Sequence, residues 1–165
     1  MQIESEDFFM PNREEKRNLE TIPVGSLGII ALKGCAPLAE QVDNYLVKWR
    51  AERESEHKES LAFSGYMRDS YLLETKVPRF GSGEAKGMIM ESVRGTDLYL
   101  LVDVLNYSQT YSLSGHENHM SPDDHYQDLK RVIAAVGGKA RRITVIMPFL
   151  YESRQHKRTS RESLD

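Results

Sequence analysis

The chain has 165 residues, of which 39% are hydrophobic and 28% are charged, a composition typical of a globular protein with one core. Its net charge of -3 argues against a surface built to coat nucleic acid, which normally carries a strong positive excess. Cys35 is the only cysteine, which excludes an internal disulfide and a thiolate-rich metal cage and fits a reducing compartment. The opening residues lack a secretory signal, and no stretch approaches the roughly 18 apolar residues of a membrane span. We therefore expect a cytoplasmic protein without a membrane or nucleic-acid partner.

Residues 1–23 are polar and mostly acidic, with one apolar cluster from Phe8 to Met10. This pattern fits an arm packed onto a larger body or a neighbour, and it fits a disordered segment equally well. Residues 24–165 are expected to form one domain. The domain opens with a continuous apolar run, residues 28–32, that predicts a strand buried on both faces.

A helix is predicted to begin near Pro37, since proline suits a first helical turn. Five apolar residues then fall on one side of the helix at spacings of three and four: Leu38, Val42, Tyr45, Leu46 and Trp49. Residues 50–60 are rich in charge, which is typical of a solvated helix end or a surface insertion.

Two short strands, residues 71–77 and 87–93, are predicted on either side of the turn-rich residues 78–83, as in a hairpin with a wide loop. Residues 98–102 are apolar throughout and predict a second fully buried strand. A long polar connection follows, from residue 105 to residue 120.

Ser121 predicts the start of a second helix, because a hydroxyl cap, proline in the first turn and two acids all suit a helix amino terminus. Gly137 and Gly138 predict its end. Residues 143–147 predict a third buried strand, stopped by Pro148. Strand, helix and strand in this order indicate a right-handed parallel crossover and an α/β fold.

Residues 148–161 follow the last predicted strand and are dense in arginine and lysine. Ligands collect beyond the carboxyl ends of strands in an open parallel sheet, and these side chains suit phosphate oxygens. A solvated basic tail explains the same composition.

Two segments of the chain carry recognisable motifs. Residues 143–149, followed by Arg154 and Gln155, are similar to the Ile-Thr-X-Val-Ile-Pro-Tyr strand of ribose-phosphate pyrophosphokinases and to the Arg-Gln pair after it. Residues 80–84 and 91–99 are similar to the family's Phe-Ser-Asp-Gly-Glu and Ser-Val-Arg-Gly-X-Asp-Val-Tyr motifs, in the same order and with the same local spacing. The resemblance covers most of the chain from about residue 29 to residue 165.

The resemblance implies a three-layer α/β domain with a mainly parallel sheet, phosphoribosyltransferase-like, as the truncated amino-terminal half of an enzyme that moves pyrophosphate from ATP to ribose 5-phosphate. It also implies a homo-oligomer whose ATP site is shared between subunits. The implied ATP-binding residues are Phe80, Ser82 and Glu84 from one chain, and Arg154, Gln155 and His156 from its neighbour. The family's magnesium ligands, catalytic loop and ribose 5-phosphate motif belong to a second domain absent here, so this chain alone is expected to be inactive.

Several features depart from the family pattern. His156 stands where aspartate usually follows the Arg-Gln pair, and Ser82 stands where Asp or Asn is more usual. The connection from residue 106 to residue 120 is also longer than usual. These departures keep open a second hypothesis, a non-catalytic regulatory or scaffolding subunit that resembles the enzyme.

Three of the five histidines, His116, His119 and His125, fall within ten residues in and just after this connection. Imidazole and carboxylate at such spacing can bind zinc, but nothing in the sequence fixes tetrahedral geometry, so we interpret these residues as a solvated insertion. No metal ligand is therefore assigned in this chain. A third hypothesis, a generic anion-binding α/β module with a metal-binding histidine loop, requires both motif matches to be accidental.

Overall fold

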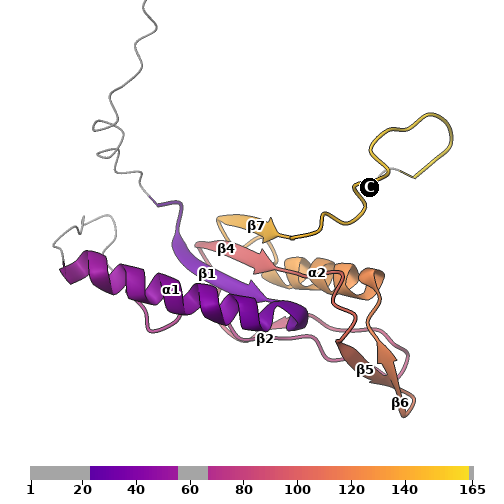
Figure 1. Cartoon of the computed structure of the whole chain (residues 1–165), viewed down its shortest axis with the longest axis horizontal. Helices are drawn as coiled ribbons and strands as arrows, with labels where there is room; N and C mark the ends of the chain where they lie inside the picture. The colour runs from indigo at the N-terminus through magenta and orange to yellow at the C-terminus, as the bar shows by residue number, and fades with distance from the viewer. Residues whose placement is uncertain (1–22, 56–66, 164–165) are drawn as a thin grey trace, which may run out of the picture.

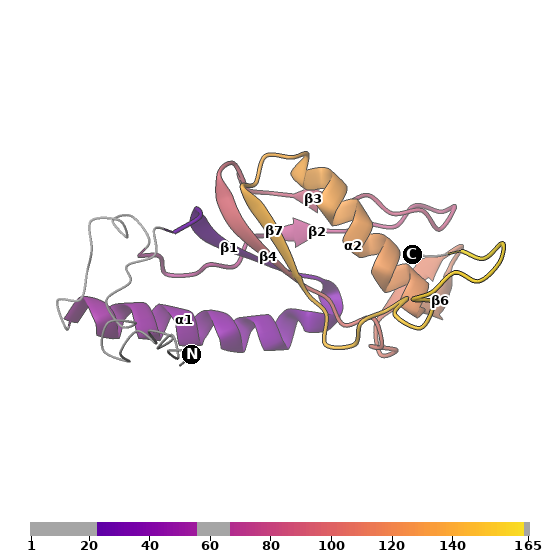
Figure 2. The ribbon, with the colours of Figure 1, turned by 90° about the horizontal axis from the view of Figure 1, so that it is seen from above.

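The computed structural model describes residues 23–55 and 67–163, which form a three-layer α/β unit. Its centre is a parallel sheet in the order β1-β4-β7, made of β1 (Ser26–Ala31), β4 (Thr96–Leu101) and β7 (Arg142–Ile146). The short turn η2 (Lys33–Cys35) leads from β1 into α1 (Ala36–Ser55), which lies along one side of the sheet, while α2 (Pro122–Val136) lies along the other (Figures 1 and 2). The predicted three-layer, mainly parallel fold is confirmed.

Strand β4 lies at the centre of the sheet because its apolar residues are buried on both faces. Leu98 and Leu100 are fully buried and pack in one cluster with Val132 of α2. Leu101 belongs to a second cluster with Ala39 of α1. Burial of apolar area on both faces is the main stabilising contribution to such a layered unit.

Helix α1 forms where the sequence predicts it, but its apolar side is not the side that packs on the sheet. Leu46 is partly buried, whereas the other four residues of that side are exposed: Leu38, Val42, Tyr45 and Trp49. The buried positions are Ala39 and Asp43, one step round the helix. Within the described residues, no helix is long and apolar enough to cross a membrane.

The predicted hairpin after α1 is present, with shorter strands than expected. β2 (Thr75–Lys76) pairs antiparallel with β3 (Met88–Ile89). Residues 71–73 instead extend the edge of the main sheet, because Ile29 donates to the carbonyl of Tyr71 at 2.8 Å and Leu73 donates to that of Ile29 at 2.8 Å. The chain continues as β2 and returns as β3, which lies beside α2 (Figure 2).

The connection predicted to be merely long and polar contains an antiparallel hairpin. β5 (Thr110–Leu113) pairs with β6 (His116–His119), and the turn between them is made by Ser114 and Gly115, which have φ angles of 53° and 81°. Two consecutive positive φ angles define the tight turn that matches the twist of a two-stranded ribbon. The hairpin projects from one end of the molecule (Figure 1).

Helix α2 has the predicted start and end. The Ser121 hydroxyl accepts from the Asp124 amide while the Asp124 carboxylate accepts from the Ser121 amide, a reciprocal capping box. Gly137 ends the helix in the left-handed conformation with φ 58°.

Strand β7 also forms as predicted, but the expectation that it is fully buried is wrong. Val145 is 38% exposed and Ile146 is 44% exposed. The physical reason is position: β7 pairs only with β4 among the described strands, so it is an edge strand whose apolar side chains are covered incompletely.

Candidate functional site

The first motif segment, residues 80–84, is the tight loop between β2 and β3. The Phe80 amide donates to the Glu84 carbonyl at 2.7 Å, and the Gly83 amide donates to the Phe80 carbonyl at 2.9 Å. Gly83 has a φ of 90°, a conformation that glycine adopts without steric cost. At the base of the loop, the Lys86 amide donates to the Pro78 carbonyl at 3.0 Å.

We name residues 79–85 the Phe80 loop. The phenyl ring of Phe80 is 51% exposed, and Ser82 and Glu84 are exposed beside it. An exposed ring on a hydrogen-bonded turn offers a face to a planar ligand such as a purine. The neighbouring hydroxyl and carboxylate can accept from an amine or a hydroxyl of that ligand.

The Phe80 loop is tied to α2 by ion pairs that are largely shielded from solvent. The Arg79 side chain is 9% exposed, and its guanidinium donates to the Asp128 carboxylate at 3.0 Å, with Asp124 at 3.7 Å. The other oxygen of Asp128 accepts from Arg131 at 2.6 Å. Burial raises the pKa of the Asp128 carboxyl, while the hydrogen bond from Arg131 and the charge of Arg79 act in the opposite direction.

The second motif segment follows β7 and is tied to the start of the same helix. The Tyr151 hydroxyl donates to the Asp123 carboxylate at 2.6 Å, and its ring meets Tyr126 edge to face at 5.5 Å. The Tyr151 amide also lies 3.3 Å from the sulfur of Met147. Glu152 follows with a φ of 65°, an uncommon conformation for a residue with a side chain.

Arg154 and Gln155 line an open hollow of about 290 Å³ together with residues 149–153. Arg154 is exposed, and its carbonyl oxygen lies 3.1 Å from Nδ1 of His156. The Gln155 side-chain amide donates to the Lys157 carbonyl at 3.2 Å. None of Phe80, Ser82 and Glu84 lines this hollow. Within one chain, the structure therefore presents the two motif segments as separate surfaces that share α2 as a support.

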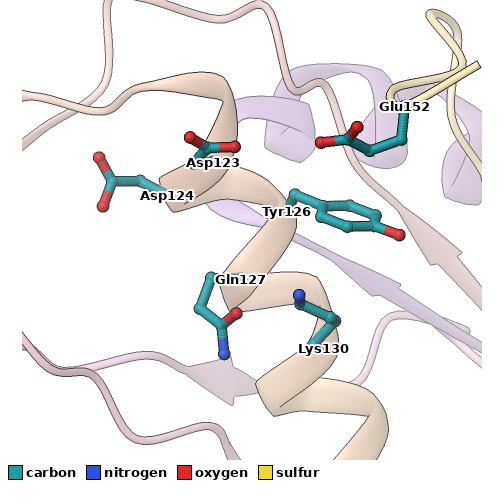
Figure 3. Close-up of a pocket in the computed structure, with 6 residues that line it drawn as sticks. All are labelled: Asp123, Asp124, Tyr126, Gln127, Lys130 and Glu152. Atoms are coloured by element: carbon teal, nitrogen blue, oxygen red, sulfur yellow. The ribbon is translucent and has the colours of Figure 1, made fainter. Parts of the chain in front are cut away.

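A larger hollow of about 620 Å³ lies over the amino-terminal half of α2. Figure 3 shows the side chains that line it: Asp123, Asp124, Tyr126, Gln127, Lys130 and Glu152. Three carboxylates against one ammonium group make this surface acidic, so it is poorly suited to phosphate oxygens. The arginines of the two motif segments offer the better anion contacts.

The histidines near the hairpin have structural partners. The ring of His119 stacks on Tyr107 at 4.4 Å, and its Nδ1 lies 2.8 Å from the Tyr107 carbonyl. His125 is buried in α2 with Nε2 2.9 Å from the Asn106 carbonyl. Among the residues that the structure describes, no group of three or more His, Cys, Asp or Glu side chains is arranged to hold a metal ion.

The hydrogen bond between Tyr151 and Asp123 predicts an unusual phenol titration. The bond to Asp123 raises the pKa of Tyr151 to about 12, because the neutral phenol is the form that donates. A raised pKa means that the bond contributes fully below the ordinary tyrosine value of about 10. Its contribution is lost as the pH rises through about 12.

This titration is measured by the ultraviolet absorbance of tyrosinate, with Tyr151→Phe identifying the phenol concerned. We expect Asp123→Asn to move that phenol back toward its ordinary pKa, and Asp103→Asn, which alters a carboxylate elsewhere, to leave it in place. Coincident curves for the wild type and Asp123→Asn would show that the bond does not form in solution.

Comparison with solved structures gives the class of the fold. The chain is similar to the crystal structure of phosphoribosylpyrophosphate synthetase from Mycobacterium smegmatis, with a TM-score of 0.51 and 23% sequence identity. The match covers 84% of this chain and 35% of that one, so this chain spans about a third of the length of that protein. At this identity the likeness shows the fold alone, an α/β domain.

The family follows from the sequence itself. The family model described as the N-terminal domain of ribose phosphate pyrophosphokinase matches residues 27–165. The chain belongs to this family, as the two motif segments predict. A search of the curated proteins finds no match.

Sequence reasoning missed the residues that support the two segments. Arg79 and Asp128 are separated by 49 positions, and Tyr151 and Asp123 by 28. A partial indication was present, because Asp128 interrupts the apolar pattern of α2 at a buried position. Lysine, arginine and aspartate are almost never fully buried unless paired, so such a residue calls for a partner.

Proposed function

We propose that this chain is the amino-terminal part of a ribose-phosphate pyrophosphokinase, which transfers pyrophosphate from ATP to the 1-hydroxyl of ribose 5-phosphate. The observation that carries the proposal is the match of the family over residues 27–165 together with an exposed Phe80 on a hydrogen-bonded loop. In this reaction the 1-hydroxyl oxygen attacks the β-phosphorus of ATP, the bond from that phosphorus to the α-phosphate oxygen breaks, and AMP leaves. The hydroxyl proton passes to solvent or to a base outside this chain.

The residues of this chain would bind and orient the nucleotide. Phe80 stacks on the purine, while Glu84 and Ser82 accept or donate at its amine or ribose. Arg154 meets the phosphates, with Gln155 and His156 beside it. Because the two motif segments form separate surfaces on one chain, the proposed ATP site joins the Phe80 loop of one subunit to Arg154 of its neighbour in a homo-oligomer.

Magnesium enters this reaction with ATP and neutralises the phosphates. Its ligands are proposed to lie outside this chain, as the family resemblance implies. We propose a cytoplasmic setting, which the single cysteine of these 165 residues fits.

One observation favours a second candidate function, a regulatory or scaffolding subunit. His156 and Ser82 depart from the family pattern at two of the proposed nucleotide contacts. Replacing an acid by an imidazole changes the charge that faces a bound nucleotide, and replacing an acid or amide by a hydroxyl weakens a hydrogen-bond acceptor. Nucleotide binding without turnover is the behaviour that this candidate predicts.

The test is a pyrophosphate-transfer assay on the longest natural form of the protein, with ATP and ribose 5-phosphate. We expect phosphoribosyl pyrophosphate to form, Phe80→Ala to slow its formation, and Leu105→Ala, which truncates an exposed residue outside the two motif segments, to leave it unchanged. Binding of ATP with no product would favour the regulatory subunit. A protein that neither binds ATP nor turns over would overturn both candidates.

A further inference from the structure

Arg79 contacts three separate elements although it lies outside the motif that follows it. One end of its guanidinium meets Asp128 of α2 at 3.0 Å. Another nitrogen donates to the Gly83 carbonyl at the tip of the Phe80 loop, at 3.4 Å. The guanidinium plane also lies over the ring of Tyr111 in β5, 4.6 Å from its centroid.

The β5–β6 hairpin covers the same loop from its outer side. A Cβ atom placed on Gly83 would lie 3.8 Å from the Leu113 side chain, so Leu113 reaches the tip of the loop. The Met120 amide donates to the Gln109 carbonyl at 2.8 Å and so closes the base of the hairpin. The hairpin is held to the domain by Lys33 of η2, whose ammonium donates to the Thr110 carbonyl at 3.2 Å. The loop therefore lies between α2 and the hairpin.

Arginine suits position 79 because its guanidinium can make several different contacts at once. Its planar fork places donors toward a carboxylate and a carbonyl at once, and its face remains free to stack on an aromatic ring. Asp128 offsets its charge, which allows the guanidinium to lie in a site where the side chain is only 9% exposed.

We propose that Arg79 is a positioning residue for the nucleotide site and that Tyr111, with the hairpin that carries it, holds Arg79 in place. The role at the nucleotide rests on the proposed function. A loop that is held in its binding conformation before the ligand arrives loses less conformational entropy on binding, so Arg79 raises the affinity for ATP without touching it. The hairpin is not among the motifs that carry the family resemblance. In this proposal it helps to support the nucleotide site.

The first measurement is amide hydrogen exchange followed by mass spectrometry on the longest natural form, without nucleotide. The reporters are the amides of Phe80, Gly83 and Lys86, which are hydrogen-bonded across the loop. We expect Arg79→Met to speed their exchange about tenfold or more and Tyr111→Leu to speed it less. Arg79→Lys is expected to restore part of the protection.

Arg131→Met is the matched control. It removes a cation from the same carboxylate, Asp128, but its side chain makes no hydrogen bond to the Phe80 loop. We expect unchanged exchange at the three reporter amides. Exchange in strand β4 should be equal in all variants, which shows that the domain stays folded.

The second measurement is the ATP dependence of turnover. We expect Arg79→Met to raise KM for ATP about tenfold with little change in kcat, because uniform binding is lost while the reacting groups remain. Unchanged loop exchange in both Arg79→Met and Tyr111→Leu would overturn the inference. A wild-type protein that binds no ATP would overturn the proposed function instead, since the exchange measurement needs no nucleotide.

Discussion

Replacing Asp128 with alanine is expected to lower the free energy of unfolding by about 3 kcal/mol, because it removes one partner from a shielded ion-pair network. Its two carboxylate oxygens accept from Arg79 at 3.0 Å and from Arg131 at 2.6 Å, and its side chain is 8% exposed. Burial raises the pKa of Asp128, so the arginines offset the loss of hydration only in part. The cost therefore comes mainly from the guanidinium of Arg79, which is left in place without its nearest carboxylate.

Urea unfolding of the longest natural form, followed by circular dichroism, measures this loss. Asp69→Ala is the control, since Asp69 is exposed and a substitution there should change stability by no more than about 0.5 kcal/mol. Equal stabilities of Asp128→Ala and Asp69→Ala would show that the network contributes nothing to the fold.

Adding one methyl group at Gly87 is expected to cost about 2 kcal/mol, since it forces the β2–β3 ribbon away from α2. A Cβ atom on Gly87 would lie 2.7 Å from the carbonyl oxygen of Arg131 and 2.8 Å from its carbonyl carbon. Both are backbone atoms of a helix, which cannot turn aside as a side chain can. The β2–β3 ribbon carries the Phe80 loop, so the shift would also weaken the contact between this loop and α2.

Thermal unfolding of Gly87→Ala beside Gly81→Ala tests this close approach. A Cβ atom on Gly81 meets nothing within 4 Å, so that variant should retain the wild-type Tm. If Gly87→Ala also retained it, the ribbon would not be seated on α2 as the structure shows.

The elements that the sequence predicted best are those whose pattern is local. Strand β4 is a continuous apolar run, and α2 carries a serine cap, a proline and a terminal glycine that act within one turn of the backbone. The hairpin of β5 and β6 was missed because His116 and its neighbours show no alternation of apolar and polar residues. Its local indications were the Ser114-Gly115 turn and the alternation of polar and apolar residues over Thr110–Leu113.

Two errors have the same physical origin. An apolar side of a helix predicts how the helix packs, but α1 has apolar residues on more than one side. The apolar residues that pack against the sheet cluster are Ala39, Leu46 and Val47. Likewise, the apolar run of β7 predicts burial only where neighbouring strands and helices cover it, and Ile146 lies at an edge. In both cases the apolar residues do not themselves show which other elements will cover them.

The candidate site was predicted from resemblance and not from spacing. Phe80 and Arg154 would otherwise be taken as an ordinary core residue and part of a solvated tail. The contacts that support them, from Arg79 to Asp128 and from Tyr151 to Asp123, join residues far apart in the chain. Such pairs become visible only when the fold brings α2 beside both segments.

The measurement that tests the central claim most directly is calorimetric titration of magnesium ATP into the longest natural form, beside the double variant Phe80→Ala and Arg154→Ala. The account predicts that the wild type binds and that the variant binds at least about tenfold more weakly, a loss of about 1.4 kcal/mol or more. Equal affinities for the two proteins, or no binding by either, would contradict it.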